Sequence, residues 1–158
     1  MQKRLILPLI LAAASLFSVR GTFAHDDNEP IATSRGSLDG KEEVLATTFD
    51  VIRQNDDAES LKFALRVVNN TKKMVEIHFP DGQTHDFIVK DSADKEIWRW
   101  SEGRMFTQAM RSKTLKGKDE TVFEESWETT GHHGTFTAVA ILRSENFPVE
   151  TTVQFTLP

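Results

Sequence analysis

The chain has 158 residues, no cysteine and a formal net charge of −5 at pH 7. The lack of cysteine excludes disulfides, thiolate metal sites and thiol catalysis. The acidic balance argues against nucleic acid or an anionic membrane surface as a partner. A chain of this length can bury one hydrophobic core, so core packing must stabilise the fold.

Residues 1–24 have the pattern of a secretory signal peptide. Lys3 and Arg4 precede an apolar run at residues 5–19, and Ala24 ends a segment with small residues at the cleavage positions. The apolar run is shorter than the roughly 20 residues of a membrane-spanning helix. We therefore expect an exported protein, periplasmic or secreted, with no membrane span after cleavage.

Residues 25–43 are polar and show little periodicity. Segments of this composition do not bury enough apolar surface to fold alone. We expect them to form a flexible leader that precedes a single domain at residues 44–158.

From residue 44 onwards, apolar and polar residues alternate with the period of a β-strand. Residues 149–157 alternate most cleanly, whereas residues 135–142 are apolar on both sides, as in a central strand. About eight short strands and no convincing amphipathic helix predict an all-β fold, namely an immunoglobulin-like antiparallel β-sandwich. The expected buried residues are Phe49, Phe63, Leu65, Val67, Ile77, Phe87, Trp127, Phe136, Ala138, Val153 and Phe155.

A series of short motifs lies between residues 78 and 110. The turn Pro80-Asp81-Gly82 separates two apolar runs, as in a β-hairpin. It is followed by His85-Asp86-Phe87, a polar turn at residues 91–95, Ile97-Trp98-Arg99-Trp100-Ser101 and Phe106-Thr107-Gln108. This succession resembles the intracellular proteinase inhibitor family, often called BsuPI.

The resemblance implies the same sandwich and the inhibition of a serine protease by a non-catalytic domain. His85 stands where many members have tyrosine, and Ala93-Asp94 stands where they have an Asp-Gly-like turn. The activity that names the family is cytoplasmic, whereas this chain starts with an export pattern. The resemblance brings no established inhibitory residues to these positions.

The tryptophans of the Trp98-Arg99-Trp100 motif are two residues apart, so on a strand they share one face. They form either an exposed aromatic pair for a partner or a cover over the end of the core with Arg99 along it. The following loop, Ser101 to Phe106, is the best candidate for an inhibitory loop, although Ser101 to Arg111 also suits a short helix. Arg104 or Met105 is the candidate anchor side chain, and Phe106 could help to hold the loop.

Histidines raise a separate possibility of copper binding. His25 becomes the N-terminal residue if cleavage follows Ala24, and His132 or His133 could supply a second imidazole ligand. The supporting ligands are unidentified, and we expect no metal and no other cofactor. The sequence also lacks the motifs of serine hydrolases, zinc proteases and phosphate-binding loops, so we do not expect an enzyme.

These observations predict an exported, non-catalytic domain that binds a protein, with a serine protease as the first candidate partner. The alternative is an accessory interaction module of a larger periplasmic assembly. The oligomeric state does not follow from the sequence.

Overall fold

The computed structural model describes residues 29–36, 44–54 and 59–158. These ranges contain ten β-strands and no helix, and hence no helix that could cross a membrane. The strands are β1 (Pro30–Gly36), β2 (Leu45–Arg53), β3 (Ser60–Asn69), β4 (Val75–Phe79), β5 (His85–Lys90), β6 (Glu96–Arg99), β7 (Arg111–Leu115), β8 (Glu120–Glu128), β9 (Gly134–Leu142) and β10 (Val149–Leu157).

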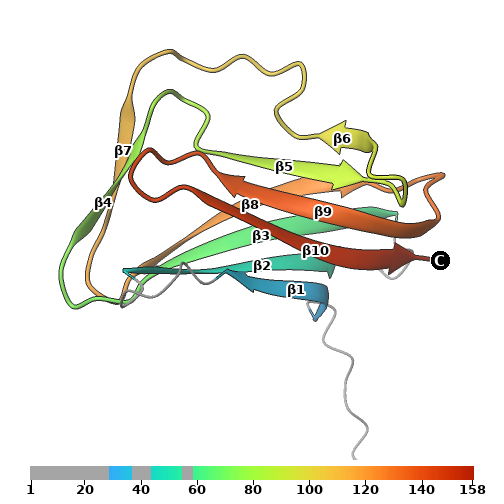
Figure 1. Cartoon of the computed structure of the whole chain (residues 1–158), viewed down its shortest axis with the longest axis horizontal. Helices are drawn as coiled ribbons and strands as arrows, with labels where there is room; N and C mark the ends of the chain where they lie inside the picture. The colour runs from blue at the N-terminus through green and yellow to red at the C-terminus, as the bar shows by residue number, and fades with distance from the viewer. Residues whose placement is uncertain (1–28, 37–43, 55–58) are drawn as a thin grey trace, which may run out of the picture.

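The strands form two four-stranded sheets and one two-stranded ribbon, and every pairing is antiparallel. The first sheet has the order β1-β2-β3-β8 and the second has the order β10-β9-β5-β6. The ribbon of β4 and β7 runs across the left-hand end of the two sheets in Figure 1. The predicted antiparallel sandwich is confirmed, with more strands than the eight or so expected.

Strand β1 lies within the segment that we expected to be a flexible leader. Its residues pair with β2, and the Thr33 hydroxyl donates to Asp50 Oδ1 at 2.8 Å. The Ser34 and Thr151 hydroxyls are 2.9 Å apart, which links β1 to the facing sheet through β10. Polar side chains suffice here because an edge strand gains its stability from backbone pairing. The expected signal peptide, the cleavage point and residues 37–43 lie outside the described residues.

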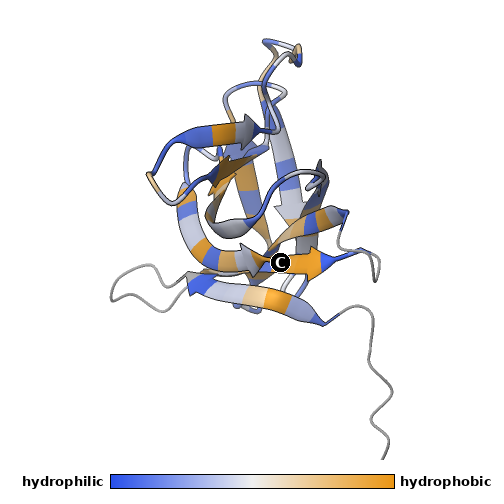
Figure 2. Cartoon of the chain, turned by 90° about the vertical axis from the view of Figure 1, so that its right-hand side faces the viewer, coloured by the Kyte–Doolittle hydropathy of each residue, from blue (hydrophilic) through white to orange (hydrophobic). Residues whose placement is uncertain are grey.

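The core consists of aromatic and branched side chains from the facing sheets. Phe63 of β3 lies at its centre, with five aromatic rings within 6.4 Å of its own, those of Phe49, Phe87, Trp98, Trp127 and Phe155. Ten of the eleven residues expected to be buried are buried, and Val153 is partly buried. Figure 2 shows the underlying alternation as orange and blue bands along the strands. Each fully buried Phe or Leu side chain contributes about 1.5–3 kcal/mol of transfer free energy.

A buried amide, that of Asn69, joins the β4–β7 ribbon to the end of β3. Its Nδ2 donates to three carbonyl oxygens, those of Lys73 at 2.7 Å, Lys116 at 2.9 Å and Leu115 at 3.1 Å. Its Oδ1 accepts from the backbone N–H and the hydroxyl of Thr71, at 2.9 and 2.8 Å. Asn69 is 0% exposed, so these bonds replace those that water would make.

The turn that follows β7 packs tightly against the same connection. A Cβ atom on Gly117 would lie 2.4 Å from the carbonyl oxygen of Lys72, which is backbone and has little room to move. Only glycine permits this close approach. The ribbon is therefore fixed at one end by backbone contact and by the Asn69 amide.

We predict that Asn69→Asp lowers the free energy of unfolding by at least about 3 kcal/mol, because a carboxylate cannot donate to the three carbonyl oxygens and would be buried beside them. Urea unfolding of the two proteins measures the difference. Asn70→Asp, at the exposed neighbouring position, makes the same chemical change and should cost less than about 1 kcal/mol. Equal losses for the two variants would contradict the role of Asn69.

Candidate functional site

The candidate site begins where β6 ends. Glu102 N–H donates to Arg99 O at 3.2 Å and Arg104 N–H donates to Ser101 O at 3.1 Å, which makes two successive tight turns. Gly103 has a φ of +72°, in the region that glycine adopts without strain. The chain then runs without regular structure from residue 104 to β7. Residues 101–110 therefore form a loop, Arg111 begins β7, and the short helix that the spacing also allowed does not form.

The carboxylate of Asp86 fixes the start of this loop. Asp86 is 2% exposed, and its Oδ2 accepts from the Ser101 hydroxyl at 2.7 Å and from Arg99 Nη1 at 2.9 Å. Its Oδ1 accepts from the backbone N–H groups of Ser101 at 3.1 Å and Phe87 at 3.0 Å. Hydrogen bonds to a charged acceptor are stronger than neutral ones. The buried charge is thus compensated, and residue 101 is held against β5.

Arg99 is held by two carboxylates of its own chain. Besides the contact with Asp86, its Nε and Nη2 donate to the two oxygens of Glu96 at 2.9 and 2.7 Å. The hydrogen bond from Arg99 lowers the pKa of Glu96, and the one to Glu96 raises the pKa of Arg99. The guanidinium therefore stabilises the end of β6 through these two carboxylates.

Trp98 and Trp100 do not form one aromatic pair. The Trp98 ring lies 5.7 Å from Phe63 and 6.3 Å from Trp127, so it belongs to the core. The Trp100 ring stacks on His85 at 4.4 Å and lies 5.6 Å from Phe106. β6 ends at Arg99, but the Trp100 N–H still donates to Phe87 O of β5 at 2.9 Å, so the strand-like pairing continues to Trp100. Both tryptophans are partly buried and pack against the core.

His85 connects the two sheets beneath Trp100. Its Nε2 lies 3.2 Å from Glu125 Oε1 on β8, and its Nδ1 lies 3.0 Å from the Thr84 hydroxyl. Burial lowers the pKa of His85, although the hydrogen bond and the charge of Glu125 oppose this effect. The roles of His85 and Asp86 as supports of the site were not expected from the sequence. The available signal was two polar residues at the start of an otherwise apolar strand.

The two candidate anchor residues differ in their surroundings. The Arg104 guanidinium lies 4.6 Å above the Trp100 ring, and its Nε donates to Trp100 O at 2.8 Å. Met105 is 99% exposed. Beyond it, Gly82 N–H donates to Thr107 O at 2.8 Å, which fixes the far side of the loop. Arg104 is thus folded back onto the protein, whereas Met105 points into solvent.

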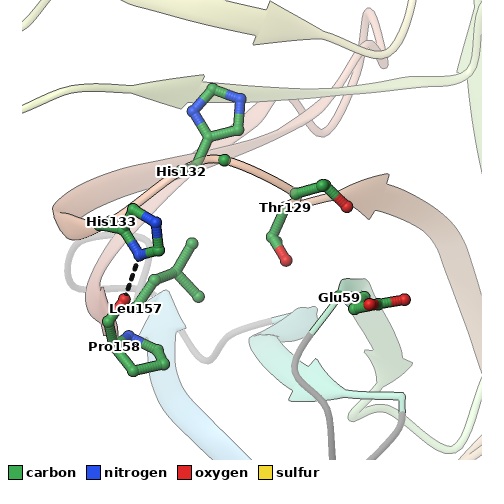
Figure 3. A pocket seen from close by; sticks show the side chains of 8 residues that line it. Glu59, Thr129, His132, His133, Leu157 and Pro158 are labelled. Atoms are coloured by element: carbon green, nitrogen blue, oxygen red, sulfur yellow. Dashed lines mark hydrogen bonds between the residues drawn. The ribbon is translucent and has the colours of Figure 1, made fainter.

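His132 and His133 lie on different sides of the β8–β9 turn, beside a surface pocket of about 220 Å³ (Figure 3). The His132 ring packs 5.1 Å from Trp127 and 6.1 Å from Phe136. His133 Nδ1 contacts the carbonyl oxygen of Pro158. The described residues include no group of three His, Cys, Asp or Glu side chains that could hold a metal ion. His25, the first proposed copper ligand, lies outside them.

The sequence matches a family model described as BsuPI, intracellular proteinase inhibitor, over residues 46–147, which is more than half of the chain. No curated protein matches it. Among solved structures, a putative ApaA protein from Bordetella pertussis is 13% identical, with a TM-score of 0.40 over 72% of this chain and 92% of that one.

Two further solved structures are similar at the same low level. The yjhA protein from Bacillus subtilis is 14% identical, with a TM-score of 0.34 over 78% of this chain and 90% of that one. A β-glucosidase from Erythrobacter marinus is 15% identical, with a TM-score of 0.32 over 63% of this chain and 13% of that one. These likenesses are too weak to carry an argument about function.

The family match contradicts one expectation from the sequence. The family is described as intracellular, so the expectation of an exported protein, periplasmic or secreted, is wrong. That expectation depended on the pattern of residues 1–24, which is a compositional signal and lies outside the described residues.

We predict that Asp86→Asn destabilises the fold by about 3 kcal/mol and mobilises residues 101–104, because a neutral amide cannot compensate the charge of Arg99. Amide hydrogen exchange should speed up at Ser101 and Arg104, and urea unfolding should report the loss. Asp94→Asn, in the exposed turn before β6, should change the stability by less than about 0.5 kcal/mol. Unchanged exchange at Ser101 would show that Asp86 does not order the loop.

A second prediction concerns the effect of pH on His85. Its pKa is lower in the folded protein than the ordinary value of 6.5, so the unfolded chain binds the proton more readily. Its contribution to stability is therefore present above about pH 6.5 and is lost as the pH falls through the lowered folded-state pKa. His85→Tyr keeps an aromatic ring and introduces a hydroxyl group, but it does not titrate in this range. Its free energy of unfolding should fall less than that of the wild type on acidification, and identical pH profiles would contradict the prediction.

Proposed function

Because this chain belongs to the BsuPI family of intracellular proteinase inhibitors, we propose that it binds a serine protease and blocks its active site without catalysing a reaction. An inhibitor family implies a protease as the partner, and the choice of a serine protease is part of the proposal. The fold offers a rigid sandwich from which a loop can be presented to a cleft.

The observation that carries this proposal is the restrained loop at residues 101–106. Asp86 holds it at Ser101, the Trp100 ring supports it through Phe106, and Gly82 binds the following Thr107. A loop that is ordered before binding loses less conformational entropy when it binds. This property favours an inhibitor over a flexible segment that would be cut as a substrate.

Within this loop, Met105 is the better anchor for the primary pocket of the protease. Its side chain is free, whereas Arg104 would have to give up its contacts with the Trp100 ring and carbonyl. Methionine is unbranched and polarisable, and it fills apolar pockets of irregular shape. The target should therefore be a protease with an apolar primary pocket and not one with an acidic pocket, which selects arginine.

Inhibition constants against serine proteases of both pocket types test the proposal. We expect inhibition of an enzyme with an apolar pocket and recovery of the loop uncut by mass spectrometry. Preferential inhibition of an enzyme with an acidic pocket would select Arg104 in place of Met105. If the protein inhibits no protease and a non-protease complex is recovered with it, the alternative of an accessory interaction module replaces the proposal.

We predict that Met105→Ala weakens inhibition by at least about 30-fold, as the loss of a central anchor worth about 2 kcal/mol does. Met74→Ala provides a matched control, because Met74 is also an exposed methionine but lies before β4, outside the loop. It should leave the inhibition constant unchanged. Both variants should unfold at the wild-type urea concentration, and equal inhibition by Met105→Ala and the wild type would remove Met105 from the contact.

A further inference from the structure

The β7 strand has an edge that no other described strand pairs with. Among the described strands it pairs with β4 alone, in a ribbon of two strands. Its residues 111–114 are exposed whichever face of the strand they lie on. Figure 1 shows the β4–β7 ribbon at the left-hand end of the molecule, beyond the ends of the two main sheets. Such an edge presents a row of backbone donors and acceptors to which another extended segment can bind.

Positive charge accumulates along this edge, although the whole chain carries −5. Residues 103–118 contain five basic residues and no acidic one. Arg111 and Lys113 lie on β7, and Lys116 follows it; none of the three forms an ion pair with another residue that the structure describes. Basic residues elsewhere do form ion pairs. Lys62 and Arg66 of β3, for example, each contact a glutamate of β8 in the same sheet.

Exposed methionines lie at both ends of the ribbon. Met110 directly precedes β7 and is 78% exposed, and Met74 directly precedes β4 and is 70% exposed. Because the two strands are antiparallel, these side chains lie at opposite ends of the ribbon. Methionine adapts its shape to an apolar contact, and it is common at surfaces that accept varied partners.

We propose that the free edge of β7 binds an extended acidic segment of a partner protein, which adds to the β4–β7 ribbon as a third strand. The free backbone donors and acceptors of β7 favour an extended peptide as the partner. The basic side chains without ion pairs favour a peptide with acidic side chains. A two-stranded ribbon has little stability of its own, so a third strand would strengthen it. This site does not depend on protease inhibition.

Two other occupants fit the edge less well. A second copy of the chain would bring two segments of the same positive charge together, which costs energy through like-charge repulsion. The phosphates of a nucleic acid could contact the basic side chains of this edge. A nucleic acid has no peptide backbone to pair with the strand, however, and the acidic remainder of this protein repels it. The experiment described next would detect either of these two occupants.

Amide hydrogen exchange of the full chain, with and without a synthetic peptide, tests the proposal. The probe has about nine residues that alternate threonine with glutamate, the length of a strand. It should slow exchange at every second amide of β7, those that point away from β4. A peptide with glutamine in place of glutamate should bind at least about fivefold more weakly, and one with alternate N-methylated bonds should not protect β7.

A pair of charge variants localises the contact. Lys113→Gln should weaken binding of the acidic peptide about fivefold, whereas Lys95→Gln, an exposed lysine in the β5–β6 turn, should not. Met105→Ala should bind the peptide as the wild type does, so failure of protease inhibition would leave this result unaffected. Equal binding of the glutamine peptide, tighter binding of a single-stranded oligonucleotide, or protection of β7 by dimerisation without peptide would each overturn the proposal.

Discussion

The adhesion of two sheets through aromatic rings is the interaction on which the rest of this structure depends. The chain has no cysteine, so no disulfide joins the sheets. Phe63 lies between the sheets, and its neighbours Phe87 and Phe155 come from the sheet opposite to its own. Tilted and edge-on rings at these distances add to the free energy of area burial. Without this aromatic cluster the two sheets would not stay packed together, and the local contacts described above would not form.

Burial of apolar area does not specify direction, so the parts outside the sandwich need directional contacts. Two buried polar side chains provide them, and each extends from the end of a core strand. Asn69 fixes the β4–β7 ribbon through three carbonyl oxygens. Asp86 fixes the start of the loop after β6 through Ser101 and Arg99. A buried side chain of this kind that lost its hydrogen-bond partners would destabilise the fold. The attached segment is therefore held in a single arrangement.

The sequence predicts those parts of the fold in which one face of a strand is apolar. Strand β10 follows its alternation, and the central position of β9 follows from apolar residues on both faces. Strand β1 was missed because its pairing uses backbone atoms and hydroxyl groups, which leave no periodic signal. The polar turn before β6 forms where the sequence predicts it. Asp94 adopts a φ of 61° there, a conformation that suits the glycine of the turn to which it was compared.

The candidate site was predicted less well, because its geometry depends on contacts between individual side chains. The spacing predicts one face for the two tryptophans, and both pack against the core, but it does not indicate that Trp98 contacts Phe63 whereas Trp100 stacks on His85. The position of the Arg104 guanidinium over Trp100 follows from the tight turns at residues 101–104 and not from any sequence period. Periodicity therefore identified the segment, whereas the contacts of individual side chains required coordinates.

Residues 101–115 show how these constraints act together. The segment is attached at its start by Asp86, near its middle by Gly82 and at its end by Asn69. Fixed points at such intervals reduce the conformations open to the residues between them. Met105 lies between the attachments at Asp86 and Gly82, and Met110 lies between those at Gly82 and Asn69. Both methionine side chains are exposed. Because the backbone of this segment is already ordered, it would lose little backbone entropy in the two binding roles proposed for Met105 and Met110.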